Sequence, residues 1–231
     1  MAAFLVIADD HPLFRDALRL AVLQTVAAAE IAEAESFDGL CAQLRATPDA
    51  DLVLLDLNMP GMRGFSGLLY LRAEFAAVPV VVISANENTA VMRRALDLGA
   101  VGYIPKSAAA SEIRRALQAL LAGETWLPAA LNPGEASRDG DARLTASLNS
   151  LTPQQSRVLM LLSEGLLNKQ IAHAMQVSEA TVKAHVSAIL QKLGVENRTQ
   201  AVIVARRLAV EVAEPEPEAM SGAASGGAAS R

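Results

Sequence analysis

The sequence has one cysteine and no long apolar run, and both shortages exclude classes of protein. Because Cys41 is alone among 231 residues, an intrachain disulfide and a zinc site of several cysteines are excluded. No apolar run reaches the length of about 18 residues that a membrane-spanning helix needs. Asp9 and Asp10 interrupt the amino terminus before a signal-peptide core could form. We therefore expect a soluble, cytoplasmic protein with no membrane partner.

A strong net charge is also missing, but the charge is distributed unevenly. The chain carries 20 lysines and arginines against 25 aspartates and glutamates, a formal net charge of −5. Residues 151–210 hold seven basic and three acidic side chains, a local excess of +4. A basic segment inside an acidic chain predicts an anionic partner for that segment, with nucleic acid as the first candidate.

Acidic residues follow two of the most apolar segments in the chain. Asp9 and Asp10 come directly after residues 4–8. Asp56 comes directly after residues 52–55. Such runs are typical of parallel strands buried on both faces, whose carboxyl ends meet at one edge of the sheet. We expect the three carboxylates to lie together at that edge, where open α/β sheets bind ligands.

Two more polar side chains are predicted at the same edge. The apolar residues 80–83 lead to Ser84, and residues 102–105 lead to Lys106. Carboxylate oxygens suit a hard cation such as Mg²⁺, whereas an ammonium and a hydroxyl suit phosphoryl oxygens. The combined set predicts a site for a divalent cation and a phosphoryl group.

Periodicity divides the chain into parts. Residues 1–124 alternate five apolar strand segments with amphipathic helices, which predicts a doubly wound α/β domain. Residues 125–147 contain proline and glycine without a sustained period and are predicted to be a linker. Residues 148–210 show only helical signals, and residues 211–231 have a composition typical of disorder. The first helix is expected to bury Leu13, Phe14, Ala17, Leu18, Ala21 and Val22.

Capping signals mark the helices of the small all-α domain. Thr152 and Gln155 form a capping box around a proline at the first helical position. Asn168 and Ser178 are each expected to cap a further helix, and Asn197 with Gln200 a fourth.

The helix that follows Ser178 has an apolar face and a face of small residues. Its apolar stripe consists of Val182, Val186, Ile189 and Leu193. Small side chains and one lysine opposite this stripe suit close approach to the major groove of DNA. The residues expected to contact base edges are Lys183, Ala184 and Ser187. Those expected to contact phosphates are Lys169, Ser178 and Thr181.

Residues 3–123 resemble the receiver domain of two-component response regulators. The resemblance rests on the strand-end residues described above and on the segment Asp-Leu-Asn-Met-Pro-Gly-Met-Arg-Gly at residues 56–64. It implies a flavodoxin-like (βα)5 fold in which Asp56 accepts a phosphoryl group from a sensor histidine kinase. It also implies a Mg²⁺ site formed by Asp9, Asp10, Asp56 and the backbone carbonyl of Asn58, with Asp9 acting partly through water. The phosphoryl-binding and switch residues would be Ser84, Tyr103 and Lys106.

Residues 148–210 resemble the LuxR-type helix-turn-helix. The similarity rests on residues 151–159, 168–172 and 178–186. Together with a receiver in front, the architecture is similar to the NarL/FixJ subfamily of response regulators. It implies a transcription regulator that binds double-stranded promoter DNA, with phosphorylation shifting dimerisation and DNA binding, and with RNA polymerase as a further partner.

Three other functions are weighed against this one. A phosphorylation-independent regulator that uses the receiver only for dimerisation stays open. A phosphoaspartyl hydrolase of the haloacid-dehalogenase type would carry an acid two positions after its nucleophile, where this chain has Asn58. A ligand-sensing quorum regulator would need an apolar cavity in place of the acidic cluster. We expect no enzyme beyond the receiver's own phosphotransfer and dephosphorylation.

Overall fold

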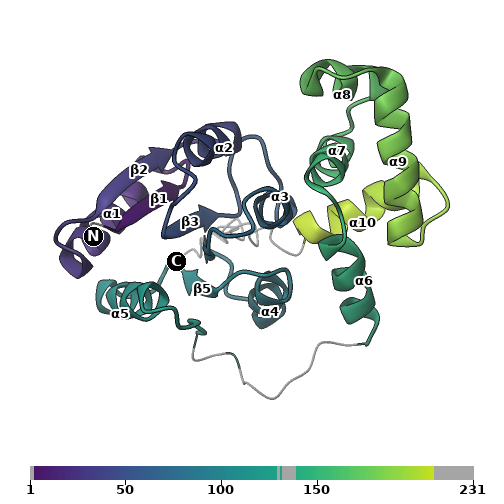
Figure 1. Cartoon of the computed structure of the whole chain (residues 1–231). Helices are drawn as coiled ribbons and strands as arrows, with labels where there is room; N and C mark the ends of the chain where they lie inside the picture. The colour runs from purple at the N-terminus through teal and green to yellow at the C-terminus, as the bar shows by residue number, and fades with distance from the viewer. Residues whose placement is uncertain (1–2, 129–130, 132–138, 211–231) are drawn as a thin grey trace, which may run out of the picture.

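One parallel sheet organises the amino-terminal part of the protein. In the computed structural model, which describes residues 3–128, 131 and 139–210, five strands pair in the order β2-β1-β3-β4-β5 (Figure 1). The strands are β1 (Phe4–Ala8), β2 (Glu30–Ala34), β3 (Leu52–Asp56), β4 (Val80–Ser84) and β5 (Gly102–Pro105). The strand order reverses between β1 and β3, and doubly wound sheets bind ligands beyond the strand ends at such a point. The predicted α/β fold class is confirmed.

Five helices cover the two faces of this sheet. They are α1 (Pro12–Thr25), α2 (Phe37–Ala46), α3 (Ser66–Glu74), α4 (Thr89–Asp97) and α5 (Ala110–Leu121). Because side chains alternate along a strand, Leu5 and Ile7 of β1 pack in the core under α1 and α5, while Val6 and Ala8 pack under α2, α3 and α4.

The predicted buried stripe of α1 was wrong at two positions, Leu13 and Ala17. The side chain of Leu13 is 87% exposed, and Ala17 is exposed as well. The buried residues of α1 are Arg15, Leu18, Ala21 and Val22. Relative to the predicted stripe, α1 is therefore rotated, and the charged residue Arg15 lies on the face toward the sheet.

Five further helices form the carboxyl-terminal part. They are α6 (Asp139–Asn149), α7 (Pro153–Ser163), α8 (Asn168–Met175), α9 (Glu179–Leu193) and α10 (Arg198–Val210). The prediction of a linker without regular structure was wrong for residues 139–147, because α6 begins at Asp139. The disorder predicted for residues 211–231 lies outside the described residues.

The capping predictions for these helices were mostly right. The Thr152 and Gln155 capping box is present, and Ser178 accepts a hydrogen bond from the backbone N–H of Thr181. The box predicted for Asn197 and Gln200 forms in half: Asn197 accepts from the Gln200 N–H, but the Gln200 side chain accepts from the Glu196 N–H. The prediction for Asn168 was wrong. Leu167 is the cap residue of α8, and Asn168 Oδ1 instead accepts from Arg198 Nη1 at 2.9 Å.

The first residues after α5 return to the sheet. The Trp126 N–H donates to Val101 O, and Trp126 O accepts from the Tyr103 N–H, both at 3.2 Å. A Cβ at Gly102 would lie 2.8 Å from Trp126 O, so only glycine permits this approach. The start of the predicted linker thus covers the outer edge of β5.

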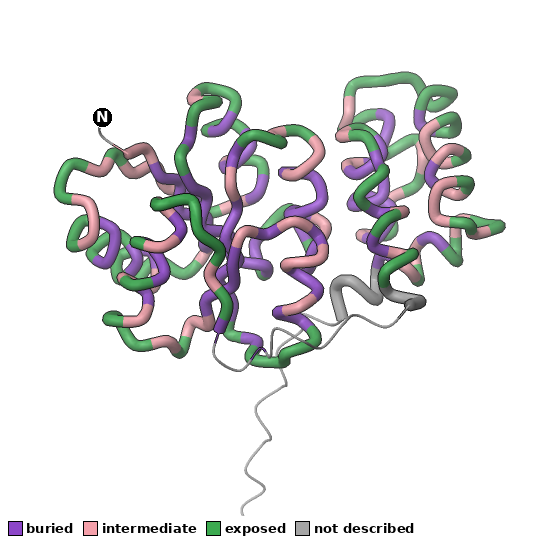
Figure 2. Tube along the Cα trace, turned by 60° about the horizontal axis from the view of Figure 1, so that its bottom comes forward, coloured by how far each residue is buried: buried purple, intermediate pink, exposed green. Residues whose placement is uncertain are grey.

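The two parts of the chain share a hydrophobic core through α3 and α7. Leu68, Leu69 and Leu71 of α3 are buried, and so are Leu159 and Leu161 of α7. One cluster of buried side chains continues from the sheet through α3 into the helical part. Figure 1 shows where α3 and α7 lie, and Figure 2 shows buried positions in both parts of the chain. Residues 67–71 of α3 are all buried, because α7 covers the face of α3 that the sheet leaves open.

Polar contacts connect the two parts at the margins of this core. Arg157 Nη2 on α7 donates to Asp38 Oδ1 on α2 at 2.6 Å, and its guanidinium lies 5.9 Å from the Phe37 ring centroid. Arg94 Nη1 on α4 donates to Thr145 Oγ1 on α6 at 2.9 Å in a buried position. In the part of the chain that the structure describes, no helix is long and apolar enough to cross a membrane.

Candidate functional site

Three carboxylates meet where β1 and β3 end. Asp9 and Asp56 are 1% and 2% exposed, while Asp10 lies half-buried at the rim. One ligand atom from each of these residues, together with one from His11, lies within 4.8 Å of the others. The predicted convergence of the three acids is confirmed. His11 is the exposed cap residue of α1.

The ammonium of Lys106 lies between the two buried carboxylates. Its Nζ is 2.7 Å from Asp9 Oδ2 and 2.9 Å from Asp56 Oδ2. The Lys106 N–H donates to Ser84 O at 2.8 Å, which continues the pairing of β5 with β4 beyond the last strand residue. This backbone bond fixes the point from which the lysine side chain reaches across the strand ends.

Burial and charge change the pKa of both partners. Burial raises the pKa of Asp56, and the Asp9 charge raises it further, whereas Lys106 and the Asn58 N–H oppose the increase without cancelling it. Burial alone would lower the pKa of Lys106, but its contacts with Asp9 and Asp56 together outweigh burial and raise it. Lys106 is therefore held in its charged form, whereas the ionised form of Asp56 is disfavoured by burial.

Two carboxylate oxygens in this cluster lack a directed hydrogen bond. Asp9 Oδ2 is close to the Lys106 ammonium, and Asp10 Oδ1 is 2.8 Å from His11 Nδ1, yet neither contact has hydrogen-bond geometry within the described residues. Buried anionic oxygens without donors are costly. Clustered carboxylate oxygens are the donor set that Mg²⁺ prefers, so these residues fit such an ion.

Ser84 and Tyr103 form a buried hydrogen-bonded group next to the acids. Ser84 Oγ accepts from the Asn86 N–H at 3.2 Å, and the Tyr103 hydroxyl donates to Asn86 O at 2.6 Å. Burial raises the pKa of Tyr103 to about 12, although a contact with Ser84 lowers it somewhat. The side chain of Tyr103 is fully buried.

The helical part contains two helices joined by a tight turn. Gln176, in a left-handed conformation at φ 55°, ends α8, and Ser178 starts α9. Val182 and Ile189 are buried, while Val186 and Leu193 are half-buried, so the predicted apolar stripe faces the core. All six residues proposed for DNA contact are exposed, namely Lys169, Ser178, Thr181, Lys183, Ala184 and Ser187.

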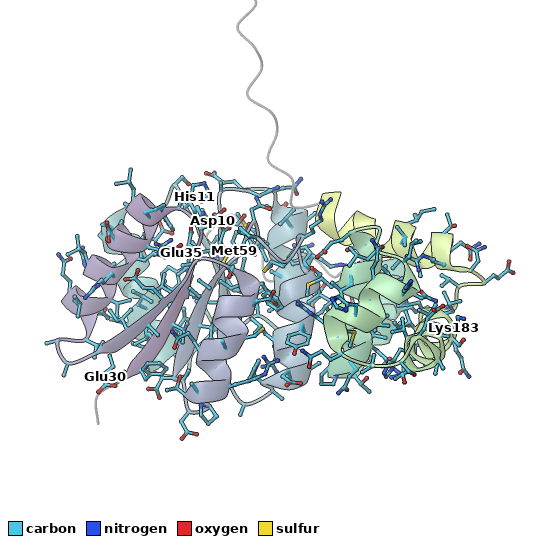
Figure 3. The ribbon with its side chains drawn as sticks, turned by 90° about the horizontal axis from the view of Figure 1, so that it is seen from above. Asp10, His11, Glu30, Glu35, Met59 and Lys183 are labelled. Carbon is cyan, nitrogen blue, oxygen red and sulfur yellow. The ribbon has the colours of Figure 1, made fainter. Side chains whose placement is uncertain are left out.

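Contacts within α9 hold two of these side chains. Lys183 Nζ pairs with Glu179 Oε1 at 3.1 Å, one turn earlier. Ser187 Oγ donates to Lys183 O at 3.1 Å. Figure 3 shows Lys183 far from the acidic residues Asp10 and Glu35, so the two sites are separate.

Comparisons with known proteins agree with this geometry. The family described as response regulator receiver domain matches residues 5–118, and the family described as bacterial regulatory proteins, luxR family, matches residues 149–205. The chain is 41% identical over 207 residues to the glycerol metabolism activator of Pseudomonas putida, covering 87% of this chain and 94% of that protein. This chain belongs to the NarL/FixJ subfamily of response regulators.

Two further similarities extend over most of this response regulator. It is 34% identical over 204 residues to the nitrate/nitrite response regulator protein NarL of Escherichia coli strain K12, covering 87% of this chain and 94% of NarL. It is also similar to a solved structure of the response regulator RcsB in complex with DNA, with a TM-score of 0.51 and 27% identity, covering 89% of this chain and 98% of that one.

Sequence reasoning missed one residue beside the site of the response regulator. Arg15 is 7% exposed and contacts the backbone of Asp9. It shares the buried face of α1 with Leu18 and Val22, at helical spacings of three and seven residues. A charged residue on a buried stripe is a signal for a paired cation, and this signal was present in the sequence.

Proposed function

We propose that this response regulator is a DNA-binding transcription regulator controlled by phosphorylation of Asp56 by a sensor histidine kinase. The observation that carries the proposal is the Lys106 ammonium held between Asp9 and Asp56 at 2.7 and 2.9 Å. In phosphoryl transfer, a carboxylate that approaches the phosphoryl oxygens meets strong repulsion, so positive charge must already be in place.

The residues at the strand ends have separate roles in this proposal. Asp56 is the phosphoacceptor, and Lys106 moves from Asp56 Oδ2 to a phosphoryl oxygen. Asp9, Asp10, Asp56 and the Asn58 carbonyl would hold Mg²⁺. When bound, Mg²⁺ would supply the positive charge that the phosphoryl oxygens require. Asp9 and Asp56, both nearly fully buried, keep this set in a water-poor environment.

Asn86 connects the phosphoryl site to the switch tyrosine. It donates its N–H to Ser84 Oγ and accepts the Tyr103 hydroxyl at its carbonyl. If Ser84 donates to a phosphoryl oxygen, we expect its Oγ to move and its hydrogen bond from the Asn86 N–H to lengthen. Because the Asn88 N–H at the start of α4 is bonded to Asn86 Oδ1 at 2.9 Å, the rearrangement reaches α4. Arg94 on α4 contacts Thr145 on α6, which extends this link to the helical part.

Control of DNA binding is proposed to act through pairing of two copies. Lys183, Ala184 and Ser187 are exposed even though α7 is packed against the receiver, so docking does not cover the recognition face. With one lysine on that face, a single copy gains few phosphate or base contacts. Two copies on neighbouring half-sites would supply the missing affinity, as in other helix-turn-helix dimers.

The oligomeric state tests this proposal against a phosphorylation-independent regulator. Light scattering should show the mass of a monomer in Mg²⁺ alone and of a dimer once beryllofluoride, a phosphoryl mimic, is added. Asp56→Asn protein should stay monomeric under both conditions. An unchanged mass in wild-type protein that has bound the mimic would favour the phosphorylation-independent alternative.

Lys183→Ala should weaken binding to DNA because it removes the only lysine of the predicted base-contact face. We expect a loss of about 1 kcal/mol, roughly fivefold, measured by fluorescence anisotropy. Arg63→Ala is the matched control, since Arg63 is an exposed cation of the receiver. It removes the same charge from the receiver rather than from α9 and should leave affinity unchanged. Equal losses of affinity in the two variants would mean that Lys183 does not contact DNA.

A further inference from the structure

A buried guanidinium lies directly behind the acidic site. Arg15 on α1 is 7% exposed, and its Nη1 donates to the backbone carbonyl of Asp9 at 2.8 Å. Its Nε contacts Glu33 Oε2 at 3.2 Å, and its Nη2 contacts Glu35 Oε1 at 2.7 Å. One side chain therefore joins α1, the end of β1 and the end of β2.

The contact with Asp9 determines how the two acids are presented. Asp9 is the first residue after β1, and its N–H donates to Ala34 O at 3.1 Å, the last bond toward β2. Its carbonyl belongs to the peptide group that joins Asp9 to Asp10. A bond from Arg15 to this oxygen fixes the plane of that peptide group. The directions of both acidic side chains depend on this plane.

The charge of Arg15 is compensated by two glutamates that do not belong to the cluster of Asp9, Asp10 and Asp56. Glu33 and Glu35 pair with it, and its bond to Asp9 goes to the backbone rather than to the carboxylate. Figure 3 shows Glu35 at the same end of the sheet as Asp10, His11 and Met59, and Glu30 at the opposite end. Arg15 is thus anchored by β2 and leaves the carboxylates of Asp9 and Asp10 available for a cation.

A purely structural role explains this arrangement less well. Burying an ion pair costs desolvation that well-packed apolar side chains avoid, so an apolar residue would serve packing as well or better. The guanidinium offers several donors in a fixed plane, which allows one residue to hold a carbonyl and two carboxylates together. Outer partners of this kind orient the groups that bind a metal, and their loss typically reduces metal affinity by about 10–100-fold.

We propose that Arg15 is a positioning residue for the divalent-cation and phosphoryl site, with Glu33 on β2 and Glu35, just after β2, as its anchors. The proposal rests on the function proposed above, because it assigns Asp9 and Asp10 to cation binding. It predicts that Arg15 acts on Mg²⁺ affinity through the Asp9–Asp10 peptide and not through its charge. The two effects have opposite signs, since removing a positive charge near three acids should by itself strengthen cation binding.

Arg15→Met keeps an apolar chain of similar reach and removes every donor. We expect Mg²⁺ to bind about tenfold more weakly to this variant in isothermal titration calorimetry, with the concentration of Mg²⁺ needed for beryllofluoride uptake raised in proportion. Arg15→Lys keeps the charge with fewer donors, and its affinity for Mg²⁺ should lie between those of Arg15→Met and the wild type. Circular dichroism of each variant checks its fold.

Arg19→Met is the matched control. Arg19 lies one turn further along α1, and its Nη1 is 3.5 Å from Glu33 Oε1. Among the contacts that the structure describes, it makes none with Asp9. This variant removes the same charge and shares a partner with Arg15, so it should bind Mg²⁺ as the wild type does, or slightly more tightly.

The outcomes separate this proposal from the one on which it rests. Unchanged or tighter Mg²⁺ binding by Arg15→Met, or equal weakening by Arg15→Met and Arg19→Met, would overturn the role of Arg15 and leave the cation site intact. If Arg15→Met does not fold, Arg15→Lys decides, and wild-type affinity in that variant would overturn the role. A wild-type protein that takes up no Mg²⁺, indistinguishable from Asp10→Asn, would remove both proposals.

Discussion

Asp56→Asn is expected to abolish phosphoryl labelling and, at the same time, to stabilise the protein in the absence of a divalent ion. Labelling is lost because the amide is not a nucleophile for the phosphoryl group. Stability rises because burial raises the pKa of Asp56, which means that the folded state disfavours its ionised form. Asparagine has nearly the shape of the aspartate side chain but carries no charge. The two effects in one variant are a signature of a buried phosphoacceptor.

The sign of the pH dependence follows from the raised pKa. A carboxyl whose folded-state pKa is raised favours folding fully below its ordinary pKa, and this contribution is lost as the pH rises through the raised value. The excess stability of Asp56→Asn should therefore be largest at neutral pH. It should shrink as the pH is lowered toward about 3.9, the ordinary pKa of an aspartate.

Two measurements on one preparation check this prediction. Labelling by acetyl phosphate shows whether Asp56 is the phosphoacceptor. The melting temperature in EDTA at several pH values shows how much burial of the Asp56 charge destabilises the protein. Asp49→Asn is the control, because Asp49 is exposed and should change neither quantity. Wild-type labelling of Asp56→Asn would show that the acceptor lies elsewhere. A melting temperature equal to that of the wild type would mean that the ionised carboxylate is not penalised by burial.

Lys106→Met is expected to cause the largest loss of stability among the site variants. Without the ammonium, Asp9 and Asp56 face each other while nearly fully buried. Breaking a buried ion pair typically costs about 3–5 kcal/mol, and we expect about 3 kcal/mol here because the half-buried Asp10 leaves the rim open to water. Phosphoryl labelling should fall as well, since the cation that offsets repulsion is gone.

Urea unfolding in EDTA and in Mg²⁺ measures this loss. Mg²⁺ should restore part of the stability of Lys106→Met, since it binds the folded state and neutralises the same carboxylates. The pKa of Lys106 is raised by its partners, so its contribution is present below about pH 10.4 and should not vary around neutral pH. Lys169→Met, which removes an exposed lysine, should change stability little. A similar small change in Lys106→Met would contradict the buried pairing.

A double variant shows whether Lys106 stabilises the fold through Asp56. If the lysine acts on this carboxylate, Lys106→Met should cost less in the Asp56→Asn background than in the wild type. Equal costs in the two backgrounds would assign its effect to Asp9 alone.

Strand-end chemistry could be predicted from the sequence because it depends on local pattern. Apolar runs placed Asp9, Asp56 and Lys106 at the same edge, since parallel strands leave their carboxyl ends together. Several helix ends could also be predicted from local pattern, namely from the capping box and from glycines that follow a helix. For example, Gly99 and Gly194 have φ values of 93° and 66°.

Features that depend on partners distant in sequence were missed. The glutamate partners of Arg15, at the end of β2 and just after it, lie 18 and 20 residues away, and no helical period reveals them. The residues of α3 show no polar face because α7 covers it, so no amphipathic period marks this helix. Leu13 fits a helical stripe but lies on the solvent side, because the buried face of α1 consists of Arg15, Leu18, Ala21 and Val22.

A phosphoryl group on Asp56 is expected to change the affinity of this response regulator for DNA. The most direct test measures binding to a duplex selected in vitro with the protein itself, in Mg²⁺, with and without beryllofluoride. We expect the mimic to tighten binding by about tenfold, within the usual range of coupling between two sites, and to have no effect on Asp56→Asn. Equal affinity of wild-type protein with and without bound beryllofluoride would contradict the claim.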